Sequence, residues 1–229
     1  GEIHDYPKEF RDLIEIALKF SKISNGAFDI TVQPLWKLYE DFYTNNNNAN
    51  KVIKDSEIKN VLKKVDYKKV FIENNKIFFK GENMSITLNG IAQGYITDKV
   101  TEILASFGIS NTLVNMGEYR ALGSKNNGED WKIGIRNPDQ TWKISQILPM
   151  QNMSVATSGG YGHFFDRNIK AHHIFNPKSG KNDNFYKSVT VKAKTATVAD
   201  GLSTTLFATN KKFHKQIINN FQNIEVIYI

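Results

Sequence analysis

The sequence of 229 residues contains no cysteine, which excludes disulfide bonds, thiolate-bound zinc and a cysteine nucleophile. Any metal ion must therefore be held by oxygen or imidazole ligands. The sequence also lacks an apolar run close to the roughly 18 residues that a membrane-spanning helix needs. No transmembrane helix is expected from it.

Positive charge is only slightly in excess, because the sequence has 30 Lys and Arg residues and 23 Asp and Glu residues. The resulting net charge of +7 favours an anionic ligand or partner, but it is equally typical of a plain basic surface. No basic cluster with interleaved aromatic residues stands out, so a nucleic-acid partner is not expected. With 40% hydrophobic residues the chain can bury a core. It is most simply one domain over residues 1–229 or two closely interlocked halves, and we predict the single domain.

The spacing of apolar residues predicts both helices and strands. The predicted helices cover residues 6–23, 36–42, 92–107 and 196–207. The predicted strands cover residues 70–72, 76–79, 85–88, 111–115, 131–135, 154–157 and 188–192. The Asn-rich residues 45–50 predict a polar loop. Helices and strands do not alternate strictly, so the predicted fold class is α+β, with mixed or antiparallel sheets and packed helices.

Asp200 and Thr204 are the first candidates for chemistry. They are four residues apart on a predicted helix, so a carboxylate and a hydroxyl project from one face. Hard oxygen ligands of this kind suit magnesium. Taken alone, the pair is also compatible with an Asp near a helix start and a Thr that bonds back to a helix carbonyl.

Two small-residue turns could bind phosphate. Gly90 lies between a predicted strand and a predicted helix, where free backbone N–H groups point outward and a diphosphate would fit. The turn is neither a P-loop nor a G-x-G-x-x-G motif, and an ordinary strand-to-helix turn is the simpler account. The second turn, around Ser158, offers hydroxyls and amides for phosphate or ribose. A serine hydrolase is less favoured there, because the G-x-S-x-G motif is missing.

Histidine could meet a substrate at His163 or at the neighbours His172 and His173. A neutral imidazole near pH 7 can accept the proton of an attacking hydroxyl. Neighbouring residues on a strand face opposite sides, so at most one of His172 and His173 could serve a given site. Further upstream, residues 28–36 mix aromatic side chains with a carboxylate, which taken alone predicts a core-packing corner.

Taken together in chain order, these segments resemble the signature blocks of the FAD:protein FMN transferases, the ApbE-like flavin transferases once described as thiamine-biosynthesis lipoproteins. The matching segments are GAFDITVQPLW, TLNGIAQGYITD, LVNMGEYRALG, VATSGGYGHFF, HHIFNPKSGK and SVTVKAKTATVADGLSTTLF. They run from about Gly26 to Phe207 in the family's order. Long collinear blocks are far more specific than any single motif.

The resemblance implies a magnesium-dependent enzyme that moves the FMN half of FAD onto a threonine hydroxyl of an acceptor protein while AMP leaves. Carried over position by position, Asp200, Thr204 and the carbonyl of Gly90 match the family's metal ligands, and Ser203 is close enough to assist. His173 matches the histidine that acts as general base.

The resemblance also implies positions that contact FAD. These are Ala27, Phe28, Asp29, Thr87, Gln93 and, through its backbone, Phe175. Thr87 stands where the family usually has Asp and Gln93 where it usually has Lys, which removes one charge of each sign from the same turn. The family's GGD is Gly117-Glu118-Tyr119 here, and Asn176 replaces an Asp.

The partners implied by the resemblance are FAD and an acceptor flavoprotein that carries a threonine flavinylation site. The implied location is the periplasm or cell envelope, near a membrane through the acceptor. Family members usually have several dozen residues before the first helix, including a block that touches the flavin. We therefore expect a single flavin transferase domain over residues 1–229 that lacks this N-terminal segment.

Two other functions stay open at this point. If water attacks in place of the acceptor, the protein is an FAD pyrophosphatase that gives FMN and AMP. The substitutions at Thr87, Gln93 and Asn176 would also fit a non-catalytic protein that only binds FAD.

Overall fold

The structure is a computed structural model that describes residues 1–44, 48, 50–140, 142–168, 170–183 and 185–229. The chain forms two compact units, each assembled from two separate stretches of sequence. The first unit combines Gly1–Leu88 with Gly162–Asn184, and the second combines Asn89–Tyr161 with Phe185–Ile229. The expectation of a single domain over residues 1–229 stays a prediction.

Where the structure describes it, the N-terminal stretch of the first unit forms the α-helices α1 (Lys8–Ile23), α2 (Gln33–Thr44) and α3 (Asp55–Leu62). Pro7 precedes α1 with an extended backbone, and the chain leaves the helix through left-handed conformations at Asn25 and Gly26. Short 3-10 turns cover Ile30–Val32 and Tyr67–Lys69. The amphipathic pattern of residues 6–23 is confirmed, because one face of α1 is buried.

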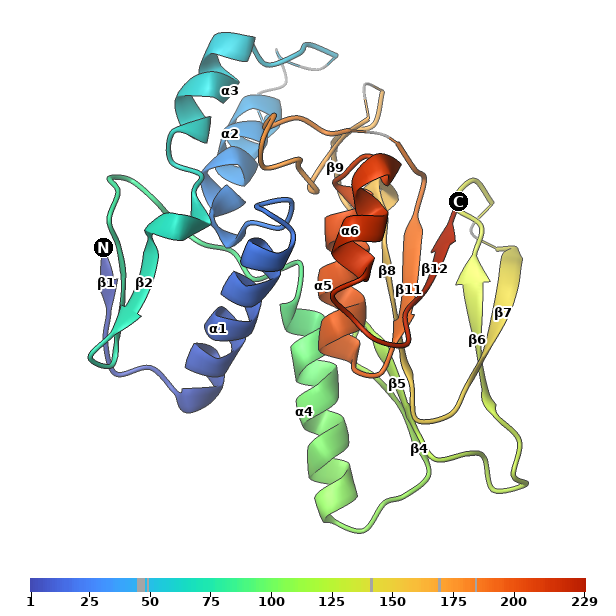
Figure 1. Cartoon of the computed structure of the whole chain (residues 1–229). Helices are drawn as coiled ribbons and strands as arrows, with labels where there is room; N and C mark the ends of the chain where they lie inside the picture. Colours follow the sequence, from blue (N-terminus) through green and yellow to red (C-terminus); the bar gives the residue numbers. More distant parts are fainter. Residues whose placement is uncertain (45–47, 49, 141, 169, 184) are drawn as a thin grey trace. The chain divides into compact units, whose positions relative to one another are not determined.

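A small antiparallel sheet in the first unit has the order β1-β3-β2, from Glu2–Ile3, Lys76–Phe79 and Val70–Glu73 (Figure 1). The predicted hairpin is confirmed: Glu73 pairs with Lys76, and Asn74 and Asn75 between them both have positive φ. Asn tolerates this left-handed conformation, which the tightest hairpin turns require. A second pair of strands, β9 (Phe164–Asp166) and β10 (Ala171–His172), precedes the segment with His173.

The core of this part of the first unit packs α2 and α3 against the segment after residue 162. Leu35 and Tyr39 of α2 pack with Ile58 of α3 and with Phe175. The ring of Tyr39 lies 4.7 Å from that of Phe175, and its hydroxyl donates to the carbonyl of Gly180. Two stretches of chain more than a hundred residues apart thus share one core.

The second unit is built on an antiparallel five-stranded sheet of order β12-β11-β8-β5-β4. Its strands are β4 (Thr112–Asn115), β5 (Tyr119–Leu122), β8 (Ser154–Ser158), β11 (Val189–Ala193) and β12 (Glu225–Tyr228). A separate hairpin, β6 (Trp131–Arg136) and β7 (Ile144–Met150), shares a core with it through Ile133, Leu148 and Val155.

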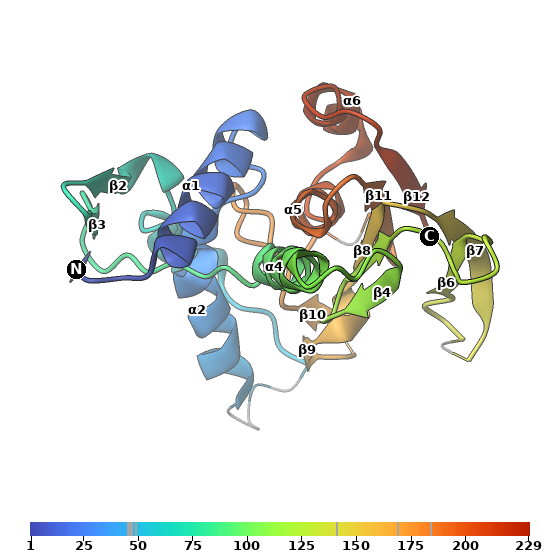
Figure 2. The same ribbon diagram turned by 90° about the horizontal axis from the view of Figure 1, so that it is seen from below.

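Two helices of the second unit lie side by side against the sheet, as both views show (Figures 1 and 2). They are α4 (Ala92–Ser106) and α5 (Ala196–Phe207), and α5 packs on β8 and β11. Nearly every residue of α5 is buried, which fits its run of small and apolar residues. After α5 come a 3-10 turn, Lys211–Phe213, and the short helix α6 (His214–Ile218). This unit contains all four residues predicted to bind the metal.

Most of the predicted elements are confirmed, but the strand predicted at residues 85–88 is wrong. That segment pairs with no strand, and the N–H of Thr87 donates instead to the carbonyl of Ile30. The structure also contains elements that the sequence pattern did not predict, namely α3, α6, β1, β5, β7, β9, β10 and β12. Within the predicted polar loop 45–50, residues 45–47 and 49 lie outside the described residues.

The predicted α+β class is confirmed by helices combined with antiparallel sheets. None of the helices formed by the described residues combines the length and the hydrophobicity needed to cross a bilayer.

Candidate functional site

The residues predicted to bind a metal gather where α4 begins and α5 runs past it. Gly94, in the first turns of α4, donates its backbone N–H to Oδ2 of Asp200 on α5 over 2.9 Å. A Cβ atom at Gly94 would lie 2.3 Å from the carbonyl oxygen of Ala196, so only glycine allows this close approach. Gly90 lies in the turn before α4, four residues ahead of Gly94.

The start of α5 is fixed by a carboxylate from α4. Asp98 accepts hydrogen bonds from the backbone N–H groups of Ala196 and Thr197, at 2.9 and 2.8 Å, and from the Thr197 hydroxyl. Arg120 of β5 binds the same carboxylate at 2.7 Å. Asp98 thus caps the N-terminus of α5 and holds Asp200 one turn further along.

Three hydroxyls lie together beside Asp200. Oγ of Ser158, at the end of β8, lies 2.8 Å from Oγ of Ser203 and 3.1 Å from Oγ1 of Thr204. Ser203 also donates to the carbonyl of Asp200. The structure therefore brings Asp200, Ser203 and Thr204 together and adds Ser158, which the sequence predicted only as part of a phosphate or ribose turn.

Two carboxyl groups are buried in this region without a compensating charge. Burial raises the pKa of Asp200 to about 7, while the N–H of Gly94 acts in the opposite direction. Burial is the main cause that raises the pKa of Glu118 to about 8, and the charge of Asp200 raises it further. The backbone N–H of Thr157 lowers this pKa by a smaller amount. Neither carboxyl group forms an ion pair with another residue of the described chain.

This arrangement fits a bound divalent cation. Asp200 uses Oδ2 for Gly94, and its Oδ1 accepts no hydrogen bond from the described residues. A buried carboxylate of this kind is costly unless a cation or donor compensates it, and carboxylate, hydroxyl and carbonyl oxygens are the ligands magnesium prefers. No group of three or more His, Asp or Glu placed for metal binding occurs among the described residues. The predicted set differs from such a group, because it combines one carboxylate with hydroxyl and backbone carbonyl oxygens.

The predicted general base, His173, lies in the first unit. Its Nδ1 lies 3.0 Å from the carbonyl oxygen of His163, which also accepts the backbone N–H of His173. Because a carbonyl can only accept, Nδ1 carries the proton and the lone pair of the neutral ring is on Nε2. Burial lowers the pKa of His173 below its ordinary value. The ring is therefore neutral and able to accept a proton at Nε2 near pH 7.

The neighbouring histidines differ from His173 in their surroundings. His172 is buried, and its Nδ1 accepts the backbone N–H of Ile174. His163 is exposed, with its ring stacked at 6.0 Å on Trp36. Of the two adjacent histidines, His173 is thus the more accessible.

Several predicted FAD-contacting side chains are occupied within the first unit. Asp29 accepts from the N–H and hydroxyl of Thr31 and from the N–H of Tyr67, so its carboxylate stabilises the turn that follows. Ala27 and Phe28 are buried, as is the ring of Phe175. The contact predicted for Phe175 is made through its backbone, and it stays a prediction.

The remaining two predicted contacts are more open. Thr87 is half-buried and holds the carbonyl of Ile30 through its N–H. Gln93 is exposed at the start of α4, and its side chain lies directly over Gly117, whose φ of 109° places it in a tight turn. The predicted site residues are thus divided between the units, with Ala27, Phe28, Asp29, Thr87, His173 and Phe175 in the first and Gly90, Gln93, Asp200, Ser203 and Thr204 in the second.

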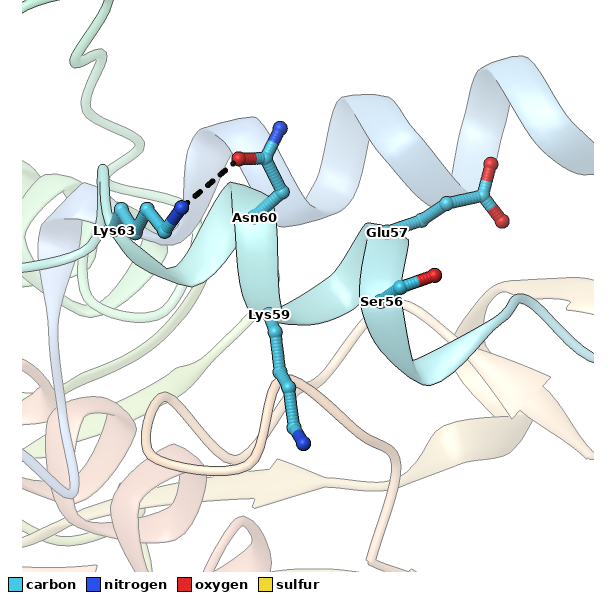
Figure 3. Close-up of a pocket in the computed structure, with 5 residues that line it drawn as sticks. All are labelled: Ser56, Glu57, Lys59, Asn60 and Lys63. Carbon is cyan, nitrogen blue, oxygen red and sulfur yellow. Dashed lines mark hydrogen bonds between the residues drawn. The ribbon is translucent and has the colours of Figure 1, made fainter.

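A depression on the surface of α3 contains none of the predicted residues. Its lining side chains are all exposed, and among them Lys63 donates a long hydrogen bond of 3.4 Å to Asn60 (Figure 3). The lining residues are Ser56, Glu57, Lys59, Asn60 and Lys63. The site around Asp200 is the stronger candidate, because its polar groups are buried.

Comparison with known proteins shows the family of this chain: the model of the ApbE family matches residues 1–228. The chain belongs to the ApbE family. Similar solved structures include the ApbE protein of Thermotoga maritima, at 30% identity and a TM-score of 0.85. The match covers 99% of this chain and 74% of that chain. The flavin transferase ApbE of Vibrio cholerae has 26% identity and a TM-score of 0.82, with 73% of that chain and 100% of this one covered.

Curated relatives of this ApbE-family chain are named for an activity. The FAD:protein FMN transferase of Haemophilus influenzae is 31% identical over 87% of this chain and 60% of its own length. That of Vibrio cholerae is 29% identical over 85% of this chain and 59% of its own length. The chain therefore spans about three fifths of the length of these two relatives.

Proposed function

We propose that this chain transfers the FMN half of FAD to a threonine hydroxyl of an acceptor protein, with Mg²⁺ bound and AMP released. The observation that carries the proposal is the match of the ApbE family over residues 1–228. Curated relatives of this chain are named FAD:protein FMN transferases. The buried oxygen atoms around Asp200 and the neutral ring of His173, with its lone pair on Nε2, support the proposal, because such a reaction needs a cation site and a base.

The proposed metal ligands are Asp200, Thr204 and the carbonyl of Gly90, with Ser203 nearby. Support comes from the uncompensated carboxylate of Asp200 and from the hydroxyls of Ser203 and Thr204 around Ser158. When bound, magnesium would neutralise the charge of the diphosphate of FAD. The protein's own part is to hold these oxygens in place, which the contacts of Gly94 and Asp98 with α5 support.

The proposed base is His173. Its Nε2 would accept the proton of the acceptor threonine hydroxyl as the oxygen of that threonine bonds to the FMN phosphorus. The bond between this phosphorus and the bridging oxygen of the diphosphate breaks at the same time, and AMP leaves with the electron pair. The hydrogen bond from Nδ1 to the carbonyl of His163 keeps the ring in the tautomer that this step requires.

A flavin-transfer assay with mass detection tests this proposal. The protein is incubated with FAD, MgCl₂ and a small acceptor domain that carries a candidate threonine, and the acceptor is then weighed intact by mass spectrometry. We expect an acceptor heavier by one FMN group and an equal amount of AMP. Replacement of the acceptor threonine by valine, or addition of EDTA, should remove both products.

The outcomes of this assay separate the alternatives. Free FMN and AMP with no flavin on the acceptor would replace the transferase by an FAD pyrophosphatase. FAD that stays intact over long incubation with Mg²⁺ would contradict both enzymatic functions and leave a protein that only binds FAD. In each case, use of acceptor domains from several flavoproteins guards against the choice of a wrong acceptor.

A further inference from the structure

Gly162 lies beside the ring of the proposed base, at a place where the fold does not require a glycine. Gly162 and His173 both belong to the first unit. A Cβ atom at Gly162 would lie 3.5 Å from Cε1 of His173, an ordinary van der Waals contact. Apart from the two chain neighbours, no other described atom lies within 4 Å of that position. The φ of Gly162 is outside the left-handed region, so other residues could adopt it.

The contrast with Gly94 shows what this means. An added Cβ at Gly94 would overlap main-chain atoms of α5, so packing explains that glycine. At Gly162 neither packing nor backbone conformation excludes a side chain. The missing side chain leaves a gap next to the ring of His173, and the gap calls for an explanation other than folding.

The gap lies at the side of the ring that the proposed proton transfer uses. In an imidazole ring, Cε1 is bonded to both nitrogen atoms. Nδ1 of His173 is occupied by the carbonyl of His163, at 3.0 Å. Nε2 forms no hydrogen bond with any of the described residues. A molecule in the gap beside Gly162 therefore meets Cε1 and lies next to the nitrogen that carries the free lone pair.

The two chain neighbours of Gly162 have rings that other contacts hold. The ring of Tyr161 lies over Gly159, where an added Cβ would be 2.4 Å from Cε1 of that ring. The ring of His163 stacks on Trp36, with 6.0 Å between the ring centroids and 20° between the planes. Neither ring can move into the gap without losing these contacts.

We infer that Gly162 is the point at which the threonine-bearing segment of the acceptor protein passes the base, and that a side chain at position 162 excludes this segment. The inference rests on the proposed function, because it concerns the acceptor of the same reaction. A base acts only when the hydroxyl lies about 3 Å from its nitrogen. The threonine carbons and the main chain attached to that hydroxyl then lie beside the ring, where a glycine lets another backbone come close.

The test uses Gly162→Ala and Gly162→Leu, which fill the gap to two degrees. The probe is an acceptor domain that receives FMN from the wild-type chain in the mass-detection assay. Transfer rates are measured against acceptor concentration at saturating FAD and Mg²⁺. We expect Gly162→Leu to lower kcat/KM for the acceptor about 100-fold and Gly162→Ala to lower it less than about tenfold, because displacement of a nucleophile by an ångström costs this much.

A binding measurement separates the acceptor from FAD. The acceptor domain with valine in place of its threonine cannot react, and calorimetry measures its binding to the whole chain with FAD present. We expect Gly162→Leu to bind it more weakly than the wild type does. The affinity for FAD, measured by flavin fluorescence, should be unchanged in both variants, which also shows that the variants are folded.

Ser56→Leu is the matched control, because it adds the same side chain at an exposed position of α3 in the same unit. Ser56 lies outside the predicted site. This variant should have the transfer rate, the acceptor affinity and the FAD affinity of the wild type.

A kcat/KM for the acceptor that is equal in Gly162→Leu and in the wild type would overturn the inference and leave the proposed function standing. Weaker binding of FAD with normal binding of the valine acceptor would assign the gap to FAD, which also overturns it. Weaker binding of both in Gly162→Ala, where the added atom makes no close contact, would do the same. If the wild-type chain transfers FMN to no acceptor domain, the proposed function is wrong and the inference falls with it.

Discussion

His173 is the residue on which the proposed proton transfer depends. We predict that His173→Ala lowers the rate of FMN transfer by about 10²-fold to 10⁴-fold, the usual range for a lost general base. FAD affinity should change little, because Nε2 acts on the acceptor. His163→Ala is the matched control, since it retains the backbone carbonyl that holds Nδ1. A transfer rate in His173→Ala close to that of the wild type would remove His173 from the mechanism.

The two buried carboxyl groups predict how stability depends on pH. Their pKa values in the folded chain, about 7 for Asp200 and about 8 for Glu118, lie above the ordinary values of 3.8 and 4.5. Between the ordinary and the raised pKa values, the folded chain therefore binds more protons than the unfolded chain. The stability that the two protonated carboxyl groups contribute is lost as pH rises. We predict that the metal-free protein loses stability from about pH 4 to about pH 8.

Urea unfolding in EDTA at several pH values measures this loss. The double variant Asp200→Asn, Glu118→Gln should show a weaker dependence on pH over the same range, and Mg²⁺ should restore stability to the wild-type chain at pH 8. Stability of the metal-free wild type that rises from pH 5 to pH 8 would contradict the prediction.

At the same scale, the sequence predicted which side chains gather at the candidate site better than it predicted their surroundings. Asp200, Ser203 and Thr204 were predicted from a helical spacing and a family motif, and the structure brings them together. Glu118 was noted only as a departure from the family's GGD. Its burial depends on β5 and on contacts with α4, which no local pattern in the sequence reveals. The roles of all these residues stay predictions.

Among the elements, α5 depends on a carboxylate that belongs to another helix. Replacement of Asp98 by Ala removes the cap from Ala196 and Thr197 and leaves Arg120 without its ion pair. We predict a loss of about 2–5 kcal/mol in the free energy of unfolding, measured in urea, together with weaker binding of Mg²⁺. Glu102→Ala on the exposed face of α4 is the control and should cost less than about 1 kcal/mol.

Stability equal to that of the wild type in Asp98→Ala would show that the cap is dispensable. Normal stability with weaker metal binding would mean that Asp98 positions Asp200 but does not stabilise the fold. The wild-type network predicts both changes together, because α5 begins at the residues that Asp98 holds.

The elements that could be predicted from the sequence are those with a strong local signal. The boundaries of α5 agree with the prediction, and the β2–β3 hairpin follows from Asn74 and Asn75. The strand β7 was missed because most of its residues are exposed on both faces, so no alternation marks it. Residues 85–88 have the composition of a strand, but Thr87 donates its N–H to the carbonyl of Ile30, and the segment pairs with no strand among the described residues. Tertiary contacts decided both cases.

On the scale of the whole molecule, the proposed metal ligands all belong to the second unit. We predict that Mg²⁺ without FAD slows hydrogen exchange in α4 and α5 more than in residues 1–88. Saturation at about 100 times the dissociation constant should add about 2.7 kcal/mol to the stability of the unit that binds the ion. Hydrogen exchange with mass spectrometry, compared with and without Mg²⁺, measures both the place and the size of the effect.

The control for this experiment is Asp200→Ala, in which Mg²⁺ should protect no segment. Protection of residues 1–88 equal to that of α5 would contradict a site built by the second unit alone. The composition was compatible with one domain or with two interlocked halves, but it did not predict which stretches form each unit. A local pattern does not record which distant stretches pack together.

Gly94 brings the backbones of α4 and α5 together at the point where Asp200 is held. An added methyl group there would overlap main-chain atoms of α5, which cannot rotate away as a side chain could. In an evolving population, no amino-acid replacement at this position is neutral. A saturation library screened for flavin transfer should return a single amino acid at position 94, while exposed positions of the same helix drift freely.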